Sequence, residues 1–207
     1  ARRFTTWVAQ DTPMTTIGAI VGSLREESVT RIALEQSLDA VTARGGDAEL
    51  VDLRAYDLPV YDADRRDAGE ADVLRADIRD ADAVLLGTPV YHGSYAAPLK
   101  NALDYCGFDE FEDTTVGLLA VAGGEFPLPA LDHLRGVLRA LDAWVLPYQA
   151  AVPSSSDVVA DGTIADPDLE ARLDTLGERI LEYADIEPDP ITFEGQHNVG
   201  AHAEESD

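Results

Sequence analysis

The sequence predicts an α/β domain in which a five-stranded, doubly wound parallel sheet carries helices on both faces. Two observations lead to this fold class. Strand-like and helix-like apolar patterns alternate along the chain, with glycine and proline between them. The chain has 207 residues, 45% of them hydrophobic, which is enough for one full core and typical of a globular protein.

The expected strands are short and apolar, and the expected helices repeat their apolar residues at helical spacing. Gly45 and Gly46 end the first helix, whereas Pro98 and the pair Asp166-Pro167 open later ones. Parallel strands need crossover helices, so this order covers both faces of the sheet. The strands are expected at 15–21, 48–53, 83–87, 116–121 and 144–146, and the helices at 29–44, 70–80, 98–105, 128–141 and 168–184.

Both ends of the chain depart from this pattern. We interpret residues 1–13 as an N-terminal arm or extension, because Met14 stands just before the first strand and fits a biological start. Residues 14–185 form the expected domain. Residues 186–207 are rich in acids and proline, which predicts an acidic, extended or disordered C-terminal tail.

The net charge of −25 at pH 7 comes from 40 acidic and 15 basic residues, and Lys100 is the only lysine. Such a surface repels nucleic acid and anionic membranes, and no apolar run is long enough to span a membrane, so we expect neither as a partner. The acids are spread over the whole chain, which argues against a nucleic-acid mimic. Scattered acid with almost no lysine resembles proteins of halophilic archaea, where molar salt shortens the Debye length to roughly 3 Å.

Cysteine and histidine usage argues against a metal site. Cys106 is the only cysteine, which excludes an internal disulfide, and its place after a helical stretch favours a packed apolar residue over a nucleophile. His197 and His202 in the tail are too few to hold a metal ion. The N-terminus lacks the apolar core of a signal peptide, so we expect a cytoplasmic protein.

Three loops follow expected strands at the carboxyl edge of the sheet, where ligands bind in such folds. The first, residues 22–28, leads into a helix whose N–H groups suit a phosphate, and Ser23, Ser28 and Arg25 add hydroxyls and a charge. It has neither a GxGxxG nor a GxxxxGK pattern, which favours a monophosphate over a pyrophosphate. Taken alone, the first loop is explained equally well by phosphate binding and by Ser28 capping the helix.

The second and third loops suit a flat ring. Residues 88–97 combine aromatic side chains, a histidine and a glycine, and residues 122–127 contain Gly123 and Gly124, which let the backbone approach closely. The alternative for the second loop is a surface loop with a tyrosine packed beneath it, and the alternative for the third loop is a flexible turn. Because all three loops meet at one edge of the sheet, we favour a ligand.

The motifs on these loops resemble those of the NADPH-dependent FMN reductase family, over roughly residues 15–150. Gly22-Ser23-Leu24-Arg25-x-x-Ser28 is similar to its phosphate loop. Leu58-Pro59-x-Tyr61-Asp62 and Gly123-Gly124 are similar to further family features in their usual order. The longest match to a family signature is Thr88-Pro89-x-Tyr91-x-x-Ser94-x-x-x-Pro98-Leu99-Lys100-Asn101-Ala102-x-Asp104.

The resemblance implies a flavodoxin-like fold with strand order 2-1-3-4-5 and non-covalently bound FMN. It also implies an oxidoreductase that passes a hydride from NAD(P)H, through FMN, to a small-molecule electron acceptor such as a quinone, a flavin, an azo compound or a metal ion. Family members commonly form homodimers or homotetramers with the flavin near a subunit interface.

The resemblance also assigns site residues. No acid–base residue is expected to be essential for hydride transfer; Tyr91 and His92 are candidates to deliver a proton to a quinone-like acceptor. Thr30 and His92 stand where many members carry asparagine, and the Thr30 hydroxyl can replace that hydrogen bond to phosphate. The cofactor-binding residues implied are Ser23, Arg25, Ser28 and Thr30 for the phosphate, Pro89, Val90, Tyr91, His92, Gly93 and Ser94 for the ring, and Gly123 and Gly124 for its pyrimidine end.

Two other functions are compatible with the sequence. An electron carrier resembling flavodoxin would bind FMN and exchange electrons with proteins without a substrate pocket. A binding or regulatory module on the same fold would take up no flavin at all.

Overall fold

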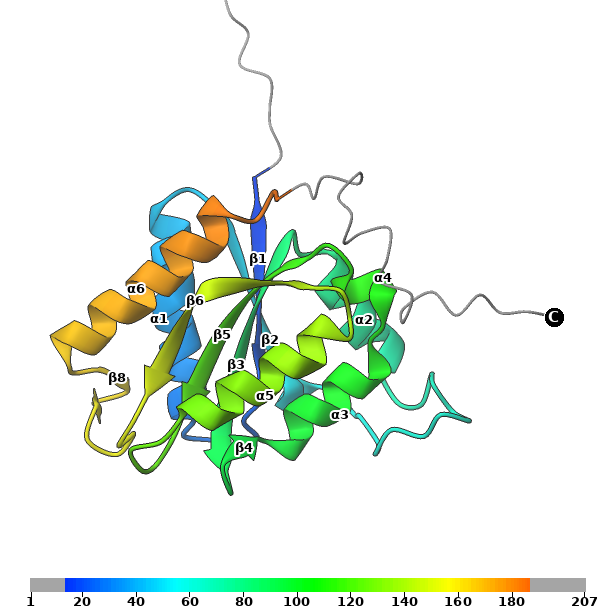
Figure 1. Ribbon diagram of the computed structural model, residues 1–207, viewed down its shortest axis with the longest axis horizontal. Helices are drawn as coiled ribbons and strands as arrows, with labels where there is room; N and C mark the ends of the chain where they lie inside the picture. Colours follow the sequence, from blue (N-terminus) through cyan, green and yellow to red (C-terminus); the bar gives the residue numbers. More distant parts are fainter. Residues whose placement is uncertain (1–13, 187–207) are drawn as a thin grey trace, which may run out of the picture.

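Five parallel strands form the central sheet of the computed structural model, which describes residues 14–186 (Figure 1). They are β1 (Thr16–Val21), β2 (Asp47–Asp52), β3 (Ala83–Tyr91), β5 (Thr115–Val121) and β6 (Trp144–Val152). Their order across the sheet is β2-β1-β3-β5-β6. The short β4 (Ser94–Tyr95) pairs antiparallel with the end of β3, so the parallel strands follow the expected order 2-1-3-4-5, and the fold class is confirmed.

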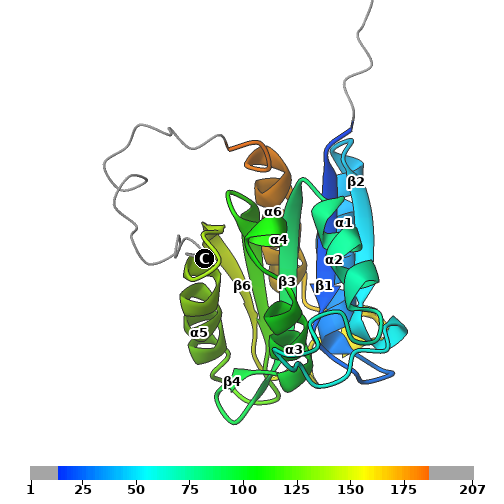
Figure 2. The ribbon, with the colours of Figure 1, turned by 90° about the vertical axis from the view of Figure 1, so that its right-hand side faces the viewer.

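Helices cover both faces of the sheet, as the turned view in Figure 2 shows. One core lies between the sheet and the pair α1 and α6, and a second lies on the opposite face under α2, α3 and α5. Gly177 lets α6 cross closely over α1, because a Cβ atom there would lie 2.0 Å from the Ser37 carbonyl oxygen. The helices are α1 (Val29–Ala43), α2 (Ala71–Arg79), α3 (Ala97–Tyr105), the short α4 (Phe108–Phe111), α5 (Leu128–Arg139) and α6 (Pro167–Glu182), and a 3-10 turn, η1, spans Leu53–Ala55.

The second loop is shorter than expected, because β3 runs on to Tyr91 and turns back into β4. His92 and Gly93 make the turn with φ of 51° and 80°, the left-handed conformation that a two-residue hairpin turn requires. The buried Thr88 closes the base of this hairpin: its hydroxyl accepts from the Ala96 N–H at 2.9 Å and donates to the Pro89 carbonyl at 3.0 Å.

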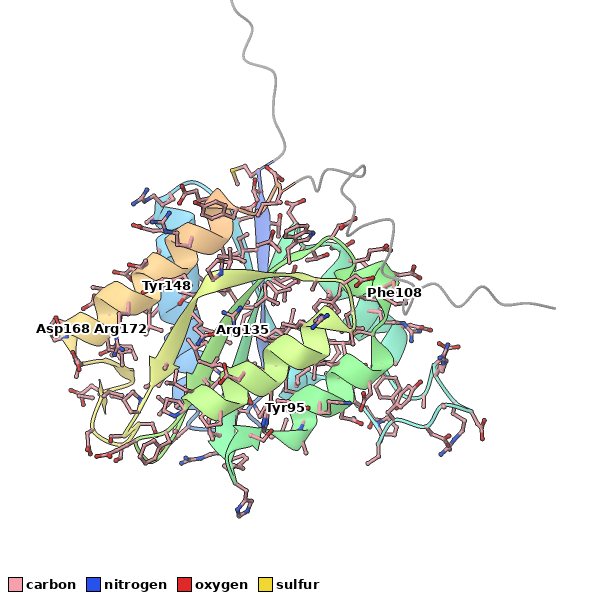
Figure 3. All side chains as sticks on the ribbon, in the orientation of Figure 1. Tyr95, Phe108, Arg135, Tyr148, Asp168 and Arg172 are labelled. Carbon is pink, nitrogen blue, oxygen red and sulfur yellow. The ribbon has the colours of Figure 1, made fainter. Side chains whose placement is uncertain are left out.

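The last strand is longer than the expected 144–146, because β6 continues past Pro147 through a shift in register opposite Gly117. Arg135 of α5, labelled in Figure 3, donates to the Leu146 carbonyl at 2.8 Å and to Gln149 Oε1 at 2.8 Å. The guanidinium thus satisfies a backbone group at the irregularity. After β6 come the short strands β7 (Val159–Ala160) and β8 (Thr163–Ile164), which the sequence pattern did not indicate.

The turn-rich segment 54–69 is fastened to α3. The Asn101 side chain accepts from the Tyr61 N–H at 2.8 Å and donates to the Pro59 carbonyl at 2.9 Å. The Tyr105 hydroxyl donates to the same carbonyl at 3.0 Å. Two stretches that resemble family motifs, around Pro59 and around Asn101, therefore contact each other directly.

No helix within residues 14–186 is long and apolar enough to cross a membrane. In the same range, no group of three or more potential ligand side chains could hold a metal ion. The expectations for residues 1–13, for the tail beyond Ile186 and for His197 and His202 lie outside the described residues.

Candidate functional site

A pocket of about 150 Å³ opens at the carboxyl edge of the sheet, between the ends of β1, β3 and β5. This is where the strand order reverses, the place where doubly wound folds bind ligands. All three expected loops contribute to it. Its lining residues are Ser23, Arg25, Ser28, Val29, Thr30, Pro89, Val90, Tyr91, Val121, Gly123 and Ser155.

The end of the pocket formed by the first loop is built of hydroxyls and backbone N–H groups. Ser28 caps α1, because its Oγ accepts from the Arg31 N–H at 3.2 Å, and Ser23 Oγ accepts from the Arg25 N–H at 3.4 Å. The capping interpretation is therefore confirmed, but both hydroxyl hydrogens remain available to an anion. The buried Thr30 adds a third hydroxyl, and no acidic residue stands in the first turn of α1 to compensate its dipole.

Arg25 is the cation at this end. It is exposed, and its guanidinium makes no hydrogen bond or ion pair with any residue of the range 14–186, in a chain with 40 acids. The hydroxyls, the helix N-terminus and this free guanidinium together fit a phosphate monoester.

The opposite end of the pocket is apolar and open. Pro89, Val90 and Val121 line it, and Tyr91 is 51% exposed at its rim. A Cβ atom at Gly123 would meet nothing within 4 Å, so the backbone there is accessible to a flat ligand. This end fits an aromatic ring system rather than a second charged group.

Four of the expected binding residues do not line the pocket: His92, Gly93, Ser94 and Gly124. His92 and Gly93 form the tip of the β3–β4 hairpin, and the Gly124 carbonyl accepts from the Ser154 N–H at 2.9 Å. The Ser94 hydroxyl lies 3.0 Å from Nδ1 of His133 on α5, so it connects the hairpin to that helix. These residues therefore lie on the elements next to the pocket, outside its lining.

Ser155 lines the pocket but was not expected there. Its N–H donates to the Ala122 carbonyl at 3.0 Å, which holds segment 153–158 against the third loop. The same serine also lines a larger adjoining groove of about 610 Å³, which shares Arg25, Ser28 and Val29 with the pocket. The serine run at 154–156 follows the observed end of β6 at Val152, but the expected strand ended at residue 146, so the sequence pattern did not place these serines at this edge.

Behind the first loop lies an ion network that the sequence also did not reveal. Asp52, the last residue of β2, pairs with Arg31 of α1 and, at 3.0 Å, with Arg54. Burial raises the pKa of the Asp52 carboxyl group, but the hydrogen bonds from Arg54 and the charges of Arg31 and Arg54 outweigh this effect and hold the pKa below its usual value.

Cys106 takes no part in the site. Burial raises the pKa of its thiol to about 12, and Sγ donates to the Ala102 carbonyl at 3.2 Å. The thiol is therefore a packed group and not a nucleophile.

The sheet order defines a flavodoxin-like α/β protein, and the residues that line the pocket at its switch point fit a phosphorylated, ring-containing ligand. Residues 15–157 match the profile of the NADPH-dependent FMN reductase family, and the chain belongs to this family. The resemblance inferred from the loop motifs is confirmed.

Curated relatives and solved structures agree with this assignment. An FMN-dependent NADPH-azoreductase of Staphylococcus saprophyticus is 35% identical over 113 residues, which make up 53% of this chain and 60% of the relative. Its Staphylococcus aureus counterpart is 36% identical over 111 residues, 52% of this chain and 59% of the relative. The chain thus spans about three fifths of these relatives. FerB, a flavoenzyme NAD(P)H:(acceptor) oxidoreductase from Paracoccus denitrificans, superposes with a TM-score of 0.68 at 25% identity, covering 83% of this chain and 97% of FerB.

Proposed function

We propose that this chain is an FMN-dependent NAD(P)H oxidoreductase that transfers a hydride from NAD(P)H to a small electron acceptor. The observation that carries the proposal is the single pocket that joins a phosphate-type end at α1 to an apolar end at Pro89, Val90 and Gly123. The bound flavin would supply the redox chemistry, whereas the protein supplies orientation and electrostatics.

The residues of the chain have distinct tasks in this proposal. Ser23, Ser28 and Thr30 donate hydroxyl hydrogen bonds to the phosphate, and Arg25 neutralises its charge. The remaining proposed residues contact or frame the ring: Pro89, Val90, Tyr91, His92, Gly93 and Ser94 on the hairpin side, and Gly123 and Gly124 at the pyrimidine end.

The rim residue Tyr91 is the better candidate to deliver a proton to the acceptor, because it lines the pocket and His92 does not. Azo compounds are the acceptor class named for the staphylococcal relatives, and we propose them first, with quinones, free flavins and metal ions as further acceptors. A homodimer or homotetramer of a cytoplasmic, salt-adapted protein completes the proposal. Exposed apolar side chains near the site support such an assembly: Leu24, Tyr91, Phe126 and Leu128.

The test is anaerobic mixing of the FMN-loaded protein with NADH and with NADPH in molar potassium chloride. We expect at least one of them to bleach the flavin absorbance, and the faster one identifies the physiological donor. Failure of both would refute the reductase function and favour the electron carrier. A purified protein that is colourless and takes up no FMN would favour the flavin-free module.

A further inference from the structure

The Arg31–Asp52–Arg54 network lies between β2, α1 and the phosphate loop 22–28. Asp52 Oδ2 pairs with Nη2 of both arginines, and Asp52 Oδ1 accepts from the Arg54 N–H at 3.1 Å. The Asp52 side chain is only 18% exposed, and those of Arg31 and Arg54 are 21% and 30% exposed. Partly buried pairs of this kind are screened by salt less than surface pairs, so the network persists in a high-salt solvent.

The network contacts the phosphate site at two places. Arg54 Nη1 donates to the Arg25 carbonyl at 3.3 Å. Within residues 14–186, this is the only hydrogen bond that ties residues 24–27 to another element. At the other place, the backbone of Arg31 donates to Ser28 Oγ while its side chain holds Asp52.

Helix stability does not explain this arrangement. A cation in the first turn of a helix is unfavourable, because it faces the positive end of the helix dipole. Arg31 stands in the first turn of α1, and that turn has no acidic residue. Its Nε is buried and lacks a partner among the described residues, a further cost.

We infer that Asp52 and Arg54 are positioning residues for the cofactor phosphate, an inference that rests on the proposed FMN site. Arg54 donates a hydrogen bond to the Arg25 carbonyl and so fixes the middle of loop 22–28. The Arg25 side chain and the loop N–H groups then face the phosphate in one conformation. Asp52 holds Arg54 in place and connects it to the first turn of α1.

This role predicts an effect opposite in sign to that of simple charge. Asp52→Asn removes a negative charge close to the phosphate site, so Coulomb attraction alone would tighten FMN binding. Positioning requires the reverse. We expect Asp52→Asn to weaken FMN binding about tenfold, the factor that corresponds to one lost hydrogen bond between charged groups.

The test uses the full chain in molar potassium chloride and measures the dissociation constants of FMN and of riboflavin by quenching of flavin fluorescence. Asp52→Asn should weaken FMN binding and leave riboflavin binding unchanged, because riboflavin lacks the phosphate. Glu178→Gln is the matched control: it breaks another α1-associated ion pair, Arg44–Glu178, at the opposite end of the helix, and should alter neither constant.

Arg54→Lys provides a second variant that retains the charge but loses the guanidinium fork that reaches both Asp52 and the Arg25 carbonyl. It should also weaken FMN binding without affecting riboflavin, and it keeps the test decisive if Asp52→Asn fails to fold. Unchanged or tighter FMN binding in the folded variants would overturn the inference, as would an equal loss for both flavins. If the wild-type protein itself binds neither flavin, the proposed function fails instead.

Discussion

The hydroxyl of Ser94 lies 3.0 Å from Nδ1 of His133, and this contact fastens the β3–β4 hairpin to α5. Ser94 stands directly after the His92-Gly93 turn, and Tyr91 on the other arm of the hairpin lines the pocket. The position of one pocket wall therefore depends on a helix that does not itself line the pocket.

A double-mutant cycle with Ser94→Ala and His133→Ala tests this contact. We expect a coupling of about 0.5–1.5 kcal/mol in the free energy of unfolding, the usual value of one side-chain hydrogen bond. Each single variant should also weaken FMN binding by about threefold, because a looser hairpin fits the ring less well. Strictly additive effects of the two substitutions would show that the contact carries no energy.

Substitution of Arg25 tests where the phosphate binds. Arg25→Ala removes the guanidinium at the phosphate end of the pocket and should weaken FMN retention by about tenfold, with little effect on the melting temperature. Arg65→Ala is the matched control, since the Arg65 side chain is 75% exposed and, within residues 14–186, forms an ion pair with Asp62 alone. Equal FMN retention in both variants would mean that the phosphate lies elsewhere.

Cys106 should behave as an inert residue that packs, partly buried, against the core. Because burial raises the pKa of its thiol to about 12, almost no thiolate exists near neutral pH, and we expect no alkylation by iodoacetamide in the folded protein. Cys106→Ala should bind FMN as the wild type does and lose about 1 kcal/mol of stability. Rapid alkylation of the native protein, followed by mass spectrometry, would contradict this assignment.

Much of the fold followed from alternation of apolar patterns, because a doubly wound sheet needs little more than buried strands separated by amphipathic helices. The departures have local causes. Pro147 interrupts the pattern of the last strand, and only the distant Arg135 shows how the strand continues past it. The His92-Gly93 hairpin was not indicated, since its turn lacks the usual Asn-Gly or Asp-Gly pair.

The candidate site also has parts that the sequence predicts and parts that it does not. That the three loops meet at one pocket could be predicted, because parallel strands bring their carboxyl ends together. The Arg31–Asp52–Arg54 network could not, because its members come from α1, β2 and η1 and meet only once β2 is placed beside β1. Neither residue spacing nor residue type identifies which of many acids and arginines form such a pair.

Asp52 also predicts a pH dependence of stability. Its folded-state pKa lies below the unfolded value, so its ion pairs stabilise the fold above the unfolded pKa, and this contribution is lost as the pH falls through the folded-state pKa. The difference in unfolding free energy between the wild type and Asp52→Asn should thus be largest above about pH 4 and shrink in stronger acid. Chemical denaturation at a series of pH values in constant salt measures it, and a pH-independent difference would contradict the role of the charge.

Gly123→Ala separates cofactor binding from folding. The backbone at Gly123 has no positive φ, and a Cβ atom there meets nothing within 4 Å, so the substitution should leave the melting temperature of the flavin-free protein unchanged or slightly raised. If the flavin ring lies against this backbone, the added methyl group occupies its place, and FMN binding should weaken by about tenfold or more.

Gly136→Ala is the matched control: Gly136 is exposed within α5, its Cβ position is equally open, and alanine there should stabilise the helix by up to about 1 kcal/mol without affecting FMN binding. Titration of both variants with FMN decides the matter, because equal affinities would place the ring away from the third loop.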